Sequence, residues 1–145
     1  MNRSGRISLV GLLGIIAVVA LVFLLLFVRE GLTAVGEKFM TALATGDTAT
    51  LTKMSYMGDT PADQVQKEWQ FATQVAGKHY LFYWRVLGAT QASQDRGSIR
   101  LQVIRNAASP AAYEENYALP LVKVGDDWKV DVRGISREMY PGLPR

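Results

Sequence analysis

The sequence predicts an α+β fold, with one N-terminal transmembrane helix followed by helices packed on a curved antiparallel sheet of about four strands. Three observations predict it. Residues 7–28 contain no charged side chain. Apolar residues then recur every three or four positions to about residue 76, and every second position from residue 79 to 132. Helices followed by a run of strands are typical of an α+β domain with helices on one face of the sheet.

The apolar segment has the length of a membrane span. Residues 7–28 number 22, which corresponds to ~33 Å of helix at about 1.5 Å per residue, against a hydrocarbon core of about 30 Å. A cleaved signal peptide would have a shorter apolar region of about 7–15 residues and a small-x-small cleavage site. The sequence after Val28 offers no such site, so we expect a retained anchor.

Charges flanking this segment predict its orientation. Arg3 and Arg6 precede it, whereas Arg29 and Glu30 follow it and cancel. Positive flanks remain in the cytoplasm, so we expect a single-pass protein of the inner (cytoplasmic) membrane with a cytoplasmic N-terminus and a periplasmic, extracytoplasmic domain. The predicted organisation is a cytoplasmic tail (1–6), a transmembrane helix (7–28), an α+β domain (29–136) and an extended C-terminal tail (137–145).

Composition excludes several classes of function. The chain carries 16 Lys+Arg against 13 Asp+Glu. Removing Arg3, Arg6 and Arg29 leaves 16 − 3 = 13 basic residues against 13 acidic ones, so the domain itself is neutral. Nucleic-acid binding requires clustered positive charge, and we expect no nucleic-acid partner. The chain has no cysteine, which excludes disulfides, thiol catalysis and cysteine-ligated iron–sulfur clusters.

The first helix of the domain is predicted over residues 30–44. Its apolar residues share one face, and Gly46-Asp47 ends it. No flexible linker separates it from the anchor, so the two are either continuous or joined by a kink near Gly31. A short helical turn is expected over residues 48–54. The residues of the shared face are Leu32, Val35, Phe39 and Leu43.

A second helix is predicted to begin at residues 60–63. Thr60 can cap it, Pro61 suits the first helical position, and Asp63 favours the positive end of the helix dipole. Gly77 is expected to end it. Its apolar stripe comprises Val65, Trp69, Ala72 and Ala76.

Alternation then predicts the strands. Residues 79–87 are largely apolar at both alternating sets of positions, so we expect a strand covered on both faces. A turn at 91–97 leads to a strand with one wet face, in which Ile99, Leu101 and Val103 point inward. A loop is expected over residues 106–112.

The last two strands form a hairpin in this reading. Residues 113–124 are predicted to be a strand, and Pro120 within it demands a sheet edge or a bulge. Gly125-Asp126-Asp127 is a hairpin turn. The inward-facing residues of the closing strand are Trp128, Val130 and Val132.

Two of these segments resemble the nuclear transport factor 2-like (NTF2-like) superfamily, the cystatin-like α+β roll. They are residues 39–47 (FMTALATGD) and 121–131 (LVKVGDDWKVD). The resemblance covers roughly residues 33–132 and implies a sheet curved round a helix, with a conical cavity. Enzymatic members of the family place Asp, His or Tyr inside it. Asp131 alternates to the outside here, and Glu114 and Glu115 must face opposite ways, so we carry over no catalytic residue.

Few residues suggest chemistry. His79 is the only histidine and lacks the partners of a triad or a metal site, so we expect no catalytic residue, metal or cofactor. Asp126 and Asp127 supply too few oxygen ligands to bind calcium, and aspartate is common in turns.

The aromatic cluster that follows His79 is either core, which we favour, or the lining of a pocket or interface. The members of the cluster are Tyr80, Phe82, Tyr83 and Trp84. Arg85 shares a face with Tyr83 and belongs to the same candidate pocket or interface.

Two further segments suggest protein contacts. In the anchor, small residues recur at every third position, which either allows another helix to approach closely or reflects ordinary membrane composition. They are Ser8, Gly11, Gly14, Ala17 and Ala20. The tail cannot be helix or central strand, so it is either disordered or docks on another subunit. Its docking candidates are Tyr140, Pro141, Leu143 and Pro144.

These observations favour a non-enzymatic accessory or assembly subunit of a larger membrane complex, with a respiratory or photosynthetic complex as a plausible host. Its expected partners are membrane lipid and other transmembrane subunits. The alternative is a membrane-tethered module that binds a lipid or small apolar ligand in the roll cavity. An enzyme that uses Tyr83, Arg85 or His79 is a third reading, which requires those side chains to converge.

Overall fold

The computed structural model describes residues 9–76 and 82–145, and for residues 9, 10, 12, 25–30, 75 and 76 it describes the backbone alone. Ser8, His79 and Tyr80 therefore lie outside the described residues. The helices and strands are α1 (Leu9–Thr45), α2 (Thr48–Met54), β1 (Ser55–Tyr56), α3 (Ala62–Phe71), the π-helical turn η1 (Ala72–Ala76), β2 (Phe82–Gln91), β3 (Arg96–Arg105), β4 (Tyr113–Val124), β5 (Asp127–Asp131) and the 3₁₀ turn η3 (Val132–Gly134).

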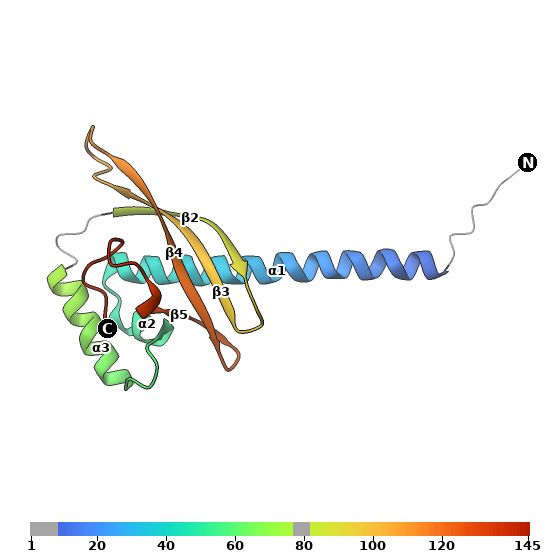
Figure 1. Cartoon of the computed structure of the whole chain (residues 1–145), viewed down its shortest axis with the longest axis horizontal. Coiled ribbons are helices and arrows are strands. Elements are labelled where there is room, and N and C mark those ends of the chain that lie inside the picture. Colours follow the sequence, from blue (N-terminus) through green and yellow to red (C-terminus); the bar gives the residue numbers. More distant parts are fainter. Residues whose placement is uncertain (1–8, 77–81) are drawn as a thin grey trace, which may run out of the picture.

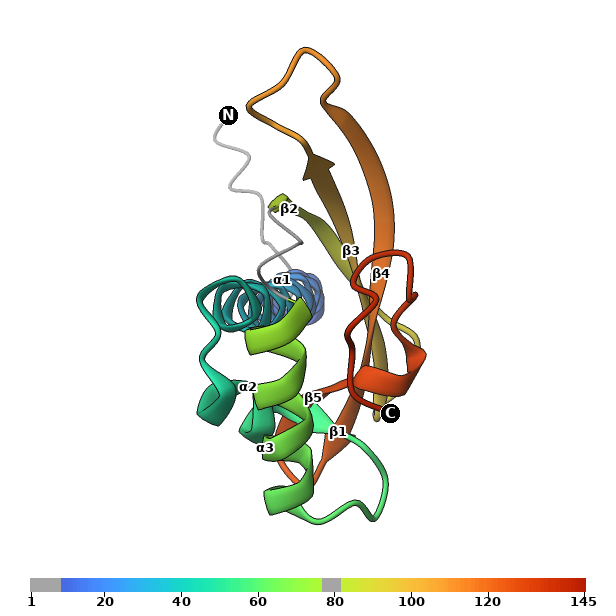
Figure 2. The same cartoon turned by 90° about the vertical axis from the view of Figure 1, so that its left-hand side faces the viewer.

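The α+β class is confirmed. The strands form one five-stranded sheet in the order β1-β5-β4-β3-β2, curved beside α1, α2 and α3 (Figures 1 and 2). The four longer strands pair antiparallel as expected, but β1 pairs parallel with β5, so the sheet is mixed. The sequence did not predict β1, because two residues are too few to show an alternation.

Helix α1 runs without interruption for 37 residues, which is ~55 Å at about 1.5 Å per residue. The alternative of a kink near Gly31 is therefore wrong. Only the C-terminal part of α1 packs on the roll, while the N-terminal part projects beyond it (Figure 1). The described residues include no helix whose length and apolar character suffice to cross a membrane.

Helix α1 lies close to the sheet at Gly36. A Cβ atom at this position would lie 2.7 Å from Cδ1 of Ile99, whose side chain is fully buried. A side chain at this position would therefore require Ile99 to shift. Leu32, Phe39 and Leu43 lie on the same face of α1 and are buried, as their spacing predicted.

Helix α3 packs beside α2 on the same side of the sheet as α1 (Figure 2). Its buried residues Val65 and Trp69 lie on the predicted stripe. The predicted cap is wrong: the Thr60 hydroxyl donates to the Met57 carbonyl oxygen at 2.8 Å, and Pro61 precedes the helix without a side-chain cap. Because the Thr60 hydroxyl is engaged with the preceding turn, it does not serve the first helical amides.

The outer face of β2 is open, contrary to the prediction that both its faces are covered. Phe82 and Trp84 are half-buried against the core, whereas Tyr83 is 67% exposed. Strand β2 is the last strand of the sheet, and α1 packs on its inner side alone. Alternation reports which residues share a face, but it does not say whether another element covers that face.

The prediction for Pro120 is confirmed. Strand β5 pairs with β4 only from Leu121 onward, so Pro120 has a partner strand on the β3 side alone, where it lies opposite Ser98. A residue without an amide N–H is tolerated there. The hairpin between β4 and β5 also turns where expected, at Gly125, whose φ of 63° suits glycine.

The C-terminal segment 135–145, whose residues 137–145 were predicted to be a tail, differs most from its prediction. It was expected to be extended and either disordered or docked on another subunit, but it folds back onto its own domain (Figure 2). Met139, Tyr140 and Leu143 are buried in the core of the roll. The domain therefore continues past residue 136.

Candidate functional site

The polar residues on the inner face of the sheet gather at one end of it. Arg105 continues the buried series Leu101 and Val103 on β3, and Glu115 and Tyr117 continue the inward series that leads to Leu119 on β4. Because alternate residues of a strand face one side, these three polar side chains point to the concave side of the roll.

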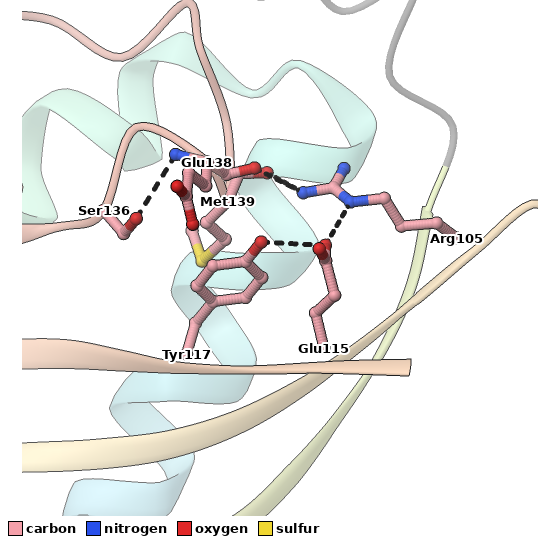
Figure 3. A network of polar contacts seen from close by, with 6 residues as sticks. All are labelled: Arg105, Glu115, Tyr117, Ser136, Glu138 and Met139. Atoms are coloured by element: carbon pink, nitrogen blue, oxygen red, sulfur yellow. Dashed lines mark hydrogen bonds and ion pairs between the residues drawn. The ribbon is translucent and has the colours of Figure 1, made fainter. Parts of the chain in front are cut away.

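The three side chains bind one another and the C-terminal segment (Figure 3). Nε of Arg105 donates to Oε2 of Glu115 at 2.7 Å, and the Tyr117 hydroxyl donates to the same oxygen at 2.8 Å. Arg105 also donates to the backbone carbonyl oxygens of Glu138 at 2.6 Å and Met139 at 2.8 Å. We call this set of residues, Arg105, Glu115, Tyr117, Glu138 and Met139, the tail clamp.

Protonation states in the tail clamp suit a structural role. The hydrogen bond from Arg105, followed by that from Tyr117, holds the pKa of Glu115 below its ordinary value. Burial raises the pKa of Tyr117. Burial opposes the charge of Arg105, but its hydrogen bond to Glu115 and the nearby Tyr117 hydroxyl outweigh this and raise its pKa. At neutral pH, the carboxylate stays ionised and the phenol stays protonated, so no group of the clamp is poised to exchange a proton.

A pH dependence of stability follows from the tail clamp. A carboxyl group whose pKa is lower in the folded state stabilises the fold above its unfolded pKa, and this contribution is lost as pH falls through the folded value. For Glu115 the window lies below its ordinary pKa of 4.5. We expect Glu115→Gln to flatten the loss of stability as pH falls below 4.5, measured by denaturant unfolding of the full chain in detergent micelles. Identical acid-side slopes for the wild type and the variant would contradict this.

Tyr140 completes the closure of the roll beside the clamp. Its ring lies edge-on to Phe82, with centroids 6.3 Å apart. Its hydroxyl donates to the carbonyl oxygen of Ala72 at 3.0 Å. The C-terminal segment therefore bridges β2 and η1 across the open end of the sheet.

The predicted aromatic cluster is divided between two faces. Phe82 and Trp84 lie on the inner side, edge-on to each other with centroids 6.2 Å apart, in agreement with the core interpretation. Tyr83 and Arg85 point the other way, and Arg85 donates to Oε1 of Gln102 on the outer face. Tyr80 and His79 lie outside the described residues. Tyr83 and Arg85, two of the three residues proposed for an enzymatic reading, therefore do not converge with the tail clamp.

The N-terminal part of α1 forms a second candidate site. Gly11, Gly14, Ala17 and Ala20 are exposed, and a Cβ atom at Gly14 would meet nothing within 4 Å. Nine large apolar side chains here are 48–69% exposed. They are Leu13, Ile15, Ile16, Val18, Val19, Leu21, Val22, Phe23 and Leu24.

Sequence reasoning missed the tail clamp. Arg105 and Glu138 are 33 positions apart, so no local spacing connects them. The one available signal was that Arg105, Glu115 and Tyr117 occupy inward-facing strand positions where apolar residues were expected. The described residues contain no group of three or more His, Cys, Asp or Glu side chains that could hold a metal ion.

Comparison with known structures decides the fold. An NTF2-like protein of unknown function from Shewanella oneidensis MR-1 matches with a TM-score of 0.50 and 8% sequence identity, over 70% of this chain and 92% of the other. A ketosteroid isomerase-like protein from Erwinia carotovora atroseptica SCRI1043 also matches with a TM-score of 0.50, at 14% identity over 70% and 89% of the two chains. The fold is that of an NTF2-like roll.

This likeness concerns the fold alone, because both identities are low and one fold carries many functions. The resemblance that residues 39–47 and 121–131 suggested is therefore supported at the level of the roll. The second structure shows that an NTF2-like roll also occurs in a ketosteroid isomerase-like protein. No family model and no curated protein matches the sequence.

Proposed function

We propose that this chain is a non-enzymatic accessory or assembly subunit of a larger membrane complex, held in the bilayer by the N-terminal part of α1. One observation carries the proposal: the large apolar side chains between Leu13 and Leu24 are exposed, and the same helix continues into the core of the roll. Fully burying a side chain of this kind contributes about 1.5–3 kcal/mol, so nine of them represent roughly 14–27 kcal/mol. A domain stability of about 5–15 kcal/mol is of the same order.

The apolar segment of the sequence extends beyond the residues whose side chains the structure describes. Residues 7–28 are uncharged throughout, which supports a span of about 20 residues. The exposed small residues Gly11, Gly14, Ala17 and Ala20 support close packing by a helix of another subunit. We place the N-terminus in the cytoplasm and the roll on the periplasmic side, because Arg3 and Arg6 precede the segment.

The tail clamp supports a role without catalysis. Its ionisable groups bind one another and the backbone of the C-terminal segment, so a substrate would have to displace that segment to reach them. The alternative, a lipid or small apolar ligand in the roll cavity, stays a prediction. The inner-face side chains that would line such a cavity are packed into the core. A respiratory or photosynthetic host complex also stays a prediction.

The test is membrane extraction of the full chain. We expect wild-type chain to remain in the membrane pellet after alkaline washing and to migrate on a native gel, after mild detergent extraction, well above the mass of a monomer. Val18→Lys in the centre of the apolar part should reduce retention, because a charge there costs about 2.5–3.5 kcal/mol on the insertion scale. Val124→Lys is the matched control, since Val124 is an exposed apolar residue of the roll.

Two results would contradict the proposal. One is recovery of the wild-type chain from the aqueous fraction, with an N-terminus after Val28. The other is a wild-type chain that migrates as a monomer with no co-purifying protein.

A further inference from the structure

Two hollows flank the end of the C-terminal segment. The larger, of about 500 Å³, lies between this segment and α3. The smaller, of about 260 Å³, lies between the segment and the residues that follow β5. Leu143, Pro144 and Arg145 line both hollows, so the two form one uneven surface divided by the chain.

The larger hollow contains an exposed aromatic side chain. Gln64, Lys67 and Phe71 recur at helical spacing on the face of α3 opposite the buried Val65 and Trp69. Phe71 is 67% exposed. A large aromatic on the wet face of an amphipathic helix, beside Pro141, is typical of the apolar centre of a protein contact.

Positive charge gathers round the same hollows. The described side chains that line them include four basic ones and a single acidic one, although the domain as a whole is neutral. The acidic one, Glu68, is engaged: its carboxylate accepts hydrogen bonds from the Arg145 backbone at 3.1 Å and from Gln64 at 3.2 Å. All four basic side chains are exposed, namely Lys67, Arg133, Arg137 and Arg145.

The surface lies at the end of the molecule opposite the apolar part of α1. Figure 1 shows α3 and the C-terminus at one end of the long axis and the projecting part of α1 at the other. If α1 is embedded in lipid, these hollows face away from the headgroups of the same membrane. Their occupant then comes from the aqueous side.

We propose that this surface binds an acidic segment of a partner protein, with an apolar side chain of that segment against Phe71 and its carboxylates against the four basic residues. The occupant follows from charge complementarity and from the exposed aromatic centre. The inference rests on the proposed function, because it specifies where the subunit contacts a neighbour outside the bilayer.

The first experiment measures peptide binding to the full chain in detergent micelles. The probe is a fluorescent twelve-residue peptide of alternating Glu and Leu with one central Phe, and its counterpart has Lys in place of every Glu. We expect the acidic peptide to bind and the basic one not to bind. Phe71→Ser and Arg137→Glu should each weaken binding about tenfold, equivalent to ~1.4 kcal/mol. Tyr83→Ser should bind as wild type, because Tyr83 is equally exposed but lies on the outer face of β2.

Three results would overturn the inference: equal binding of the acidic and basic peptides, wild-type affinity in both Phe71→Ser and Arg137→Glu, or equally tight binding of a single-stranded DNA oligonucleotide of the same charge. The last would identify a general anion patch without protein specificity.

The second experiment separates this inference from the proposed function. The same variants are extracted from native membranes and run on a native gel. We expect Phe71→Ser and Arg137→Glu to shift the chain from the large complex toward lower mass, and Tyr83→Ser to leave it in place. If the wild-type chain binds the acidic peptide but migrates as a monomer, the proposed subunit function is wrong and the inferred binding surface still holds. If the complex stays intact in both Phe71→Ser and Arg137→Glu, the inferred binding surface is wrong.

Discussion

Tyr140→Ala is expected to destabilise the roll by about 3–5 kcal/mol, the range found when a large buried aromatic is truncated to Ala. The side chain is 1% exposed, lies against Phe82 and is among the largest fully buried ones in the described part of the chain. Its removal leaves a cavity at the open end of the sheet and frees the C-terminal segment from η1. Denaturant unfolding followed by tryptophan fluorescence, with the full chain in detergent micelles, measures the change.

A conservative change separates the ring from the hydroxyl. Tyr140→Phe keeps the contact with Phe82 but leaves the carbonyl oxygen of Ala72 without this donor, so we expect a smaller loss of ~1–2 kcal/mol. Pro141→Ala is a matched control at an exposed position in the same segment. Equal stability of Tyr140→Ala and Pro141→Ala would show that the C-terminal segment does not belong to the cooperative unit.

Trp69→Ala should have an effect of similar size, about 3–5 kcal/mol. Trp69 is fully buried between α1 and β1 and lies edge-on to Phe39, with centroids 5.9 Å apart. Its Nε1 donates to the buried Ser55 hydroxyl at 2.8 Å, and that hydroxyl donates to the Leu51 carbonyl oxygen at 2.7 Å. Trp69 thus connects α3 to the short strand β1 as well as to the core.

The polar part of this contact is measured by a double-mutant cycle. Trp69→Phe and Ser55→Ala each remove one partner of the hydrogen bond, and we expect a coupling energy of ~1 kcal/mol between them. The free energies of unfolding of the wild type, the two single variants and the double variant are measured by denaturant unfolding, monitored by circular dichroism. Strict additivity of the two single changes would mean that the hydrogen bond does not stabilise the fold.

The sequence by itself determined the order of the helices and of the four longer strands, and the inward faces of those strands. Strand β4 occupies the predicted residues 113–124, and Ile99, Leu101 and Val103 are buried as their alternation indicated. These features are local, because side chains alternate along a strand and return every three to four residues along a helix. Turns such as Gly125 are local too, since their backbone angles depend on one or two residues.

Only the tertiary structure decided what covers each face and what each polar group binds. Residues 137–145 look like a free tail in the sequence because Pro and Gly exclude helix and central strand, yet Tyr140 and Leu143 are core residues. The same holds for the open face at Tyr83 and for the bonds of Arg105 to Glu115 and Met139. These contacts join residues far apart in the chain, and local periodicity contains no information about which distant segment fills a given space.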